Sequence, residues 1–221
     1  MKPHVCALVI GMTALLSAGA QAQGFDTDAP PVGKAANSVL VRVRAIGVFP
    51  QNWNSNTSIG GTISATSTAA PEVDVSYFFT DNIAAELIAA STRHTVAANG
   101  TVLGKVDVGS AWVLPPTVTL QYHFQPKERF SPYLGAGLNA TWFYNTQPAL
   151  PTVTKFTLSN NVGFDLQAGF DYNVAGAWFL NFDVKQLFLN TSARLSTVAG
   201  PVKAHTSLSP TVIGAGIGYR F

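Results

Sequence analysis

Apolar residues alternate with polar or small residues over much of this chain. Near its end they occupy every second position, at Thr211, Ile213, Ala215, Ile217, Tyr219 and Phe221. A period of two places these side chains on one face of a β-strand and the glycines and Arg220 between them on the other. An apolar strand without a partner promotes aggregation, whereas a closed barrel has no free edge. The pattern therefore predicts a barrel.

Eight segments follow this pattern, and each is bounded by Gly, Pro, Asn, Asp or Ser. The expected strands are residues 38–49, 70–79, 82–92, 112–124, 132–144, 159–172, 177–189 and 206–221. Long connections (51–69, 93–111, 145–158 and 190–205) alternate with short ones (80–81, 125–131 and 173–176). Outer-membrane barrels combine short periplasmic turns with longer extracellular loops. We therefore expect an all-β fold, an eight-stranded antiparallel transmembrane β-barrel with short periplasmic turns, long extracellular loops and both termini in the periplasm.

The first residues read as an export signal. Lys2 precedes an apolar run at residues 5–16, and Ala20-Gln21-Ala22 fits a cleavage site. We expect residues 1–22 to be a signal peptide, 23–37 a periplasmic N-terminal segment and 38–221 the barrel. Cys6 is the one cysteine and lies in the signal, so no thiol or disulfide chemistry is expected in the mature chain.

The two faces of the expected strands differ in charge. One face is apolar and uncharged, with aromatic residues near both strand ends, as in the two girdles that border a bilayer. An eight-stranded lumen is only wide enough for side chains to fill, and buried charges must pair. We therefore predict a paired polar plug rather than a wide pore. It would comprise Arg42, Arg44, Glu72, Asp74, Glu86, His123, Asp165, Asp171, Asp183, Lys185 and Arg220.

Inward positions towards the long loops are apolar instead. They are Ile46, Val48, Ile88, Val113, Phe143, Leu187, Leu189 and Leu208. Two interpretations remain open at this point. The loops could fold down over these residues as a cap, or the residues could form a pocket for an apolar small molecule, because ligand sites are concave and mostly apolar.

Pro115 and Pro116 fall inside an expected strand. Proline has no amide hydrogen to donate to a neighbouring strand, so it is usually confined to edges and bulges. The pair predicts a lateral gap in the extracellular half of the wall, through which an apolar solute could reach the outer leaflet. Alternatively, the prolines mark where the strand leaves the membrane.

Composition and motifs favour no enzymatic chemistry. Charged residues make up 11% of the chain, against about 25% in ordinary soluble domains. The 13 basic and 11 acidic residues nearly balance, which gives no indication of nucleic acid binding. His94 and His205 have no partner at metal-ligand spacing, and the glycines at 214, 216 and 218 precede no helix, as a dinucleotide motif would require. Ser91 with His94 is a weak hydrolase candidate. We expect no enzyme, metal or cofactor.

Several motifs in order resemble the OmpW family of outer-membrane proteins over essentially the whole mature chain. They are RVRA at residues 42–45, YFFTDNIAAE at 77–86, LPPT at 114–117, QYHF at 121–124, PYLGAG at 132–137 and GYRF at 218–221. The resemblance implies an eight-stranded barrel in the Gram-negative outer membrane, with an apolar extracellular channel closed at a polar base and a lateral opening. It also implies that the barrel-assembly machinery reads Phe221, and that some relatives bind bacteriocins or phage at their loops.

The resulting hypothesis is an outer-membrane channel for passive uptake of small hydrophobic molecules. These molecules and outer-membrane lipid would be its partners. The alternatives are a structural or receptor protein that acts through its loops, or a narrow ion-conducting pore.

Overall fold

The computed structural model describes residues 33–58, 60–102, 104–197 and 200–221. The expected signal peptide and residues 23–32 of the expected N-terminal segment lie outside this part. Within the described part, no helix is both long and apolar enough to cross a membrane.

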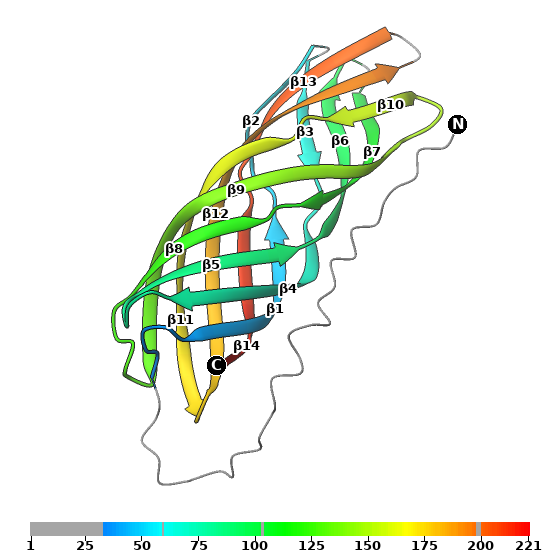
Figure 1. Ribbon diagram of the computed structural model, residues 1–221. Coiled ribbons are helices and arrows are strands. Elements are labelled where there is room, and N and C mark those ends of the chain that lie inside the picture. Colours follow the sequence, from blue (N-terminus) through cyan, green and yellow to red (C-terminus); the bar gives the residue numbers. More distant parts are fainter. Residues whose placement is uncertain (1–32, 59, 103, 198–199) are drawn as a thin grey trace, which may run out of the picture. The chain divides into compact units, whose positions relative to one another are not determined.

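Eight antiparallel strands form a closed ring, as the sequence predicted (Figure 1). The ring closes between the first and last strands, where Val39 and Phe221 exchange backbone hydrogen bonds of 3.2 and 2.8 Å. Short turns join the strands at this end, which we call the base. In ring order the strands are β1 (Val39–Phe49), β4 (Thr68–Phe78), β5 (Ile83–Ala90), β8 (Thr117–His123), β9 (Phe130–Pro148), β11 (Asn161–Ala175), β12 (Trp178–Thr197) and β14 (Thr211–Arg220).

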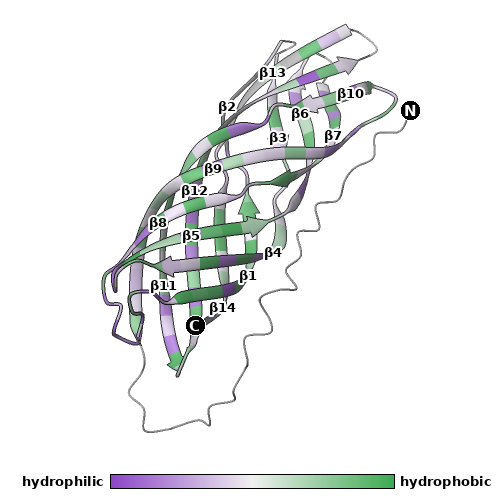
Figure 2. Cartoon of the chain, viewed as in Figure 1, coloured by the Kyte–Doolittle hydropathy of each residue, from purple (hydrophilic) through white to green (hydrophobic). Residues whose placement is uncertain are grey.

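The outer face of the ring is apolar. Large aliphatic side chains such as Leu138 are exposed on it, and hydrophobic and hydrophilic residues alternate along the strands (Figure 2). Exposed aromatic side chains gather towards both strand ends, as a bilayer-spanning barrel requires. At the base they are Tyr77, Phe79, Tyr122, Phe124, Tyr172, Trp178, Tyr219 and Phe221, and towards the other end Trp142, Tyr144 and Phe164.

The long connections carry strands of their own, which differs from the loops expected there. They extend the wall beyond the ring at the end opposite the base, which we call the top (Figure 1). Their inward positions mix small residues, such as Thr92, Ala98 and Ala204, with larger ones, such as Ile63 and Phe156, so the alternation in size is irregular. These strands are β2 (Asn52–Thr57), β3 (Thr62–Ala65), β6 (Thr92–Thr101), β7 (Gly104–Leu114), β10 (Val153–Leu158) and β13 (Gly200–Leu208).

The expected single strand at residues 112–124 is instead two strands. β7 ends at Leu114 and β8 begins at Thr117, with Pro115 and Pro116 between them. β8 pairs with β5 in the ring, whereas β7 pairs with β6 in the top extension. The prolines separate the two segments because neither can donate a ladder hydrogen bond.

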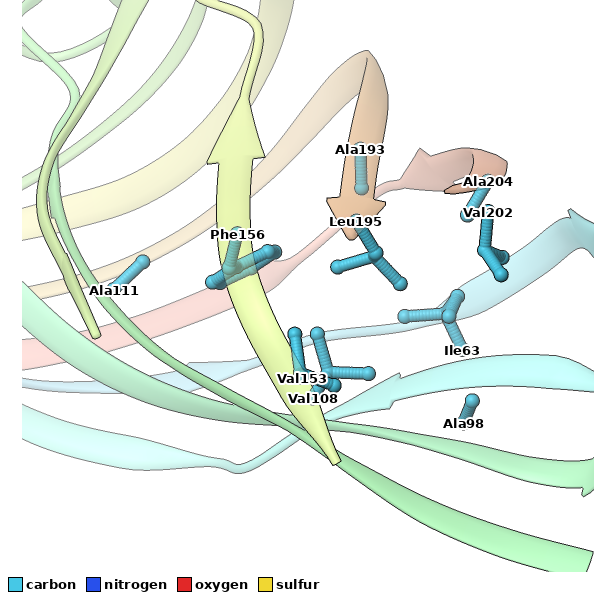
Figure 3. Close-up of a cluster of buried hydrophobic side chains, with 10 residues drawn as sticks. All are labelled: Ile63, Ala98, Val108, Ala111, Val153, Phe156, Ala193, Leu195, Val202 and Ala204. Carbon is cyan, nitrogen blue, oxygen red and sulfur yellow. The ribbon is translucent and has the colours of Figure 1, made fainter. Parts of the chain in front are cut away.

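Buried side chains form layers along the interior. Leu40, Phe78, Ala84 and Phe179 form an apolar cluster at the base. Charged side chains fill the lumen next, followed by a second apolar cluster that includes Ile46, Val48, Leu187 and Leu189. A third cluster lies between the top strands. Figure 3 shows its side chains converging from several of them, at Ile63, Ala98, Val108, Ala111, Val153, Phe156, Ala193, Leu195, Val202 and Ala204.

Candidate functional site

Arg42 lies at the centre of the charged layer. It projects from β1 and is fully buried, and its guanidinium makes five hydrogen bonds. Nε donates to Asp74 at 2.8 Å, and one terminal nitrogen donates to both carboxylate oxygens of Asp171 at 3.2 Å. The other terminal nitrogen donates to Ser76 at 2.7 Å and Glu86 at 2.8 Å. The planar fork of arginine suits such multiple recognition of carboxylates.

Arg44 continues the network towards the top. Its guanidinium lies 2.7 Å from Glu72, 3.1 Å from Asp74 and 3.3 Å from Glu86. Glu86 in turn accepts from Lys185 Nζ at 3.3 Å. Because β1 residues alternate, Arg42 and Arg44 both face inward from one strand. The network links carboxylates from several strands across the lumen.

Lys34 extends the network at the base, although the sequence pattern did not predict it as part of the plug. Its ammonium lies 2.7 Å from Asp171 and donates to His123 Nδ1 and Ser131 Oγ, both at 2.9 Å. Its backbone nitrogen also donates to the carbonyl of Pro126. Lys34 precedes the first strand, so no period of two identifies it. The described end of the N-terminal segment therefore closes the base of the lumen.

The structure brings most of the predicted plug together. Asp183 lies 3.8 Å from Arg44, while Asp165 stands apart and accepts from Thr119 at 2.9 Å. Arg220 differs from the prediction, because its side chain is only half-buried and donates to the backbone carbonyl of Gly33. It lies at the last inward position of β14 and leaves the lumen. The members joined by ion pairs are Lys34, Arg42, Arg44, Glu72, Asp74, Glu86, Asp171, Asp183 and Lys185, with His123 bonded to Lys34.

An apolar cavity of about 110 Å³ lies between the charged layer and the top. A cavity needs about 10–15 Å³ to hold a single water, so this one has room for on the order of ten waters or a ligand of similar size. Its apolar lining includes Ile46, Val48, Ile63, Ile88, Ala90, Val96, Val108, Val113, Phe143, Phe156, Leu158, Leu187, Leu189, Leu195 and Val212.

Seven of the eight side chains proposed for a pocket border this one cavity: Ile46, Val48, Ile88, Val113, Phe143, Leu187 and Leu189. The eighth, Leu208, belongs to β13 opposite Leu189, but its side chain lies outside the described part of the structure. The upper lining was not predicted from the sequence, because Ile63, Val108 and Phe156 fall in expected loops. The alternation of Ala193 with Leu195 was an available signal for this part of the wall.

His94 borders the cavity from β6, in the extension beyond the ring. Its Nδ1 donates to the carbonyl of Thr66 at 2.7 Å, and Nε2 lies 3.0 Å from the hydroxyl of Thr92. Burial lowers the pKa of His94 below its usual value, while the bond to Thr66 acts in the opposite direction. Ser91 bonds instead to Tyr144, at 2.6 Å between hydroxyl oxygens. The two residues of the hydrolase candidate are thus held by different partners.

The wall beside the cavity is interrupted at the double proline. β5 pairs with β8 as far as Ile88 opposite Thr117, and β6 pairs with β7 from Thr92 opposite Val113. The register is the same on both sides, so residues 89–91 and 114–116 lie between the two ladders.

Pro115 borders the cavity at this interruption. Its carbonyl accepts hydrogen bonds from the side chains of Thr117 at 2.9 Å and Asn139 at 3.1 Å. The carbonyl of Pro116 accepts from the amide of Ala140 at 3.0 Å. On one side, β9 therefore still forms hydrogen bonds with the two prolines. On the other side, neither β5 nor β6 pairs with them.

This chain is similar in sequence and in fold to known outer-membrane proteins. The chain is 42% identical over 225 residues to the uncharacterized outer-membrane protein y4mB of Sinorhizobium fredii (strain NBRC 101917 / NGR234), covering 98% of this chain and 96% of that protein. It is 27% identical over 164 residues to the dibenzothiophene metabolism operon protein PahQ of Pseudomonas aeruginosa, covering 73% and 76% of the two chains.

Among solved structures, the outer membrane protein OprG from Pseudomonas aeruginosa superposes with a TM-score of 0.81 at 26% identity, covering 86% of this chain and 98% of OprG. The model of the OmpW family matches residues 35–221, which include the whole ring, the top extension and the described cavity lining. This chain therefore belongs to the OmpW family and is a β-barrel protein of the Gram-negative outer membrane.

Proposed function

We propose that this barrel is a passive channel for small hydrophobic molecules, which enter the apolar cavity from the top and leave sideways beside Pro115 and Pro116. The observation that carries the proposal is the cavity itself, an apolar space of ligand size above a charged layer. Burial of apolar area, at about 25 cal/mol per Å², drives a hydrophobic solute into such a space. The relative PahQ, named for a dibenzothiophene metabolism operon, is consistent with an apolar solute.

The charged layer makes straight passage costly. A solute moving from the cavity to the base would have to separate buried ion pairs, such as Arg42 with Asp74 at 2.8 Å and Lys34 with Asp171 at 2.7 Å. Breaking one buried pair costs about 3–5 kcal/mol. The interruption beside Pro115 adjoins the cavity and requires no such separation. A lateral route is therefore the less costly one for an apolar solute.

The pocket is tested by the uptake of a fluorescent apolar probe into intact cells that express the protein. Phe143→Asp places a carboxylate at the cavity wall and should lower the uptake rate to that of cells without the protein. Val102→Asp makes the same kind of change at a side chain that is 82% exposed and should leave uptake unchanged. Equal rates for Phe143→Asp and the unaltered protein would exclude the pocket.

The lateral route is tested with cysteine cross-links across the same seam. Ser91→Cys with Leu114→Cys places thiols at positions that continue the β6–β7 register into the interruption. The control variant, Leu87→Cys with Val118→Cys, places the two thiols at a pair of residues that the β5–β8 ladder already joins. A short bifunctional thiol reagent should stop uptake only in the first variant. Uptake that persists in both would point to passage through the base.

A further inference from the structure

The polar side chains that border the cavity are mostly satisfied by partners within the protein. His94 uses both ring nitrogens on Thr66 and Thr92. The hydroxyl of Thr117 donates to the carbonyl of Pro115 at 2.9 Å, and that of Thr141 donates to Asn139. Groups that already have short intramolecular bonds gain little from a ligand.

Lys185 differs from them. It borders the cavity, is 4% exposed, and its Nζ lies 3.3 Å from one oxygen of Glu86. That same oxygen also accepts from Gln167 at 3.0 Å. A lysine ammonium has three N–H donors, and within the described residues Glu86 is the one hydrogen-bond partner of this ammonium. Two donors are thus open to an acceptor at the floor of the cavity.

Glu72 provides an acceptor at the same floor. It also borders the cavity and is 6% exposed. The nearest nitrogens of Arg44 share one of its oxygens, Oε1, at 2.7 Å. The floor therefore offers a buried ammonium that donates and a carboxylate that accepts, below walls that are apolar. A hydroxyl group can satisfy both, because it is donor and acceptor at once.

The charge of the interior selects between neutral and anionic head groups. Four cationic side chains face six acidic ones in the buried layer: Lys34, Arg42, Arg44 and Lys185 against Glu72, Asp74, Glu86, Asp165, Asp171 and Asp183. A ligand carboxylate would add to the acidic excess in a space where charges are poorly screened. A neutral hydroxyl oxygen would leave the charge of the layer unchanged.

We propose that the cavity takes neutral amphiphiles with one terminal hydroxyl, whose oxygen binds Lys185 and Glu72 while the hydrocarbon tail lies among the apolar walls. This inference rests on the proposed function and adds the substrate class and a specificity-determining residue. Plain hydrocarbons would enter the same space but leave the Lys185 donors to water.

The test uses octane, 1-octanol and octanoate, each displacing a fluorescent apolar probe from the purified full chain in detergent micelles. Empty micelles provide the correction for partitioning. With the unaltered protein, 1-octanol should bind about tenfold more tightly than either octane or octanoate at pH 8, as expected for one hydrogen bond to a charged group. Equal affinity for 1-octanol and octane, or tighter binding of octanoate, would overturn the inference. This series requires no variant to fold.

Lys185→Met then removes the donors while keeping the length of the side chain. It should remove the preference for 1-octanol and leave octane binding unchanged. Lys34→Met is the matched control, a buried lysine at the base that does not border the cavity, and it should keep the preference. Loss of the preference in both variants would assign it to the general charge balance and overturn the role of Lys185. Failure of octane and 1-octanol alike to bind the unaltered protein would instead refute the proposed function.

Discussion

Replacement of Arg42 by lysine tests whether the charged layer is held by multiple hydrogen bonds or only by charge. The substitution keeps the positive charge, but an ammonium has three donors whereas the guanidinium makes five bonds to Asp74, Asp171, Ser76 and Glu86. At least two bonds are therefore lost. A hydrogen bond to a charged group contributes about 1.5 kcal/mol or more, so the loss should be about 3 kcal/mol of unfolding free energy.

The free energy of unfolding is measured by urea titration of the barrel in detergent micelles, followed by tryptophan fluorescence. Arg93→Lys is the control, because Arg93 is exposed and bonds to Ser110 and Gln147 at 3.0 and 3.5 Å. This change should stay within about 0.5 kcal/mol. If Arg42→Lys lowers the unfolding free energy no more than Arg93→Lys does, the multiple hydrogen bonds of Arg42 do not stabilise the barrel.

Two further predictions concern the ring and the top extension. A Cβ at Gly216 would lie 2.1 Å from the backbone oxygen of Val43, whereas a Cβ at Gly214 would first meet a side-chain methyl at 3.1 Å, so Gly216→Ala should lower the urea midpoint clearly more than Gly214→Ala. Similar midpoints would show that the wall adjusts. Burial lowers the pKa of His94, so the folded state favours the neutral imidazole. The free energy of unfolding should therefore be highest above the usual histidine pKa of 6.5 and should decline as pH falls below that value. The protection factor of the Thr66 amide, which donates to Thr95, should fall in this range after correction for the intrinsic pH dependence of hydrogen exchange, and His94→Asn should abolish that fall.

The ring of strands follows from alternation because lipid and lumen impose opposite demands on successive side chains. Arg42 and Arg44 could be assigned to one inward face by parity alone, and the carboxylates opposite them could be expected to pair. Parity does not say where a long side chain ends. Arg220 has inward parity but sits at the strand end, so its guanidinium reaches the rim. Lys34 supplies the buried charge instead, from a segment with no repeat pattern.

The top of the molecule was less predictable for a related reason. The strands beyond the ring pack their inner faces together, and their outer faces do not contact lipid. Their outward residues therefore need not be apolar, and the contrast in hydrophobicity between the two faces weakens. Val108 and Phe156 line the cavity from segments that read as loops. The double proline was informative in a different way, because a missing amide hydrogen limits pairing in any environment. The interruption between β7 and β8 lies at those residues.

The contacts of the segment before β1 also impose an order on assembly. Lys34 binds Asp171 of β11, His123 of β8 and Ser131 of β9, and Gly33 accepts from Arg220 of β14. The partners of Lys34 come together only when β8, β9 and β11 have paired, and Gly33 reaches Arg220 only when β14 is in place. The earliest described residues of the chain therefore dock after strands that follow them in sequence, and protection of the Lys34 amine from chemical modification would report the pairing of β8, β9 and β11.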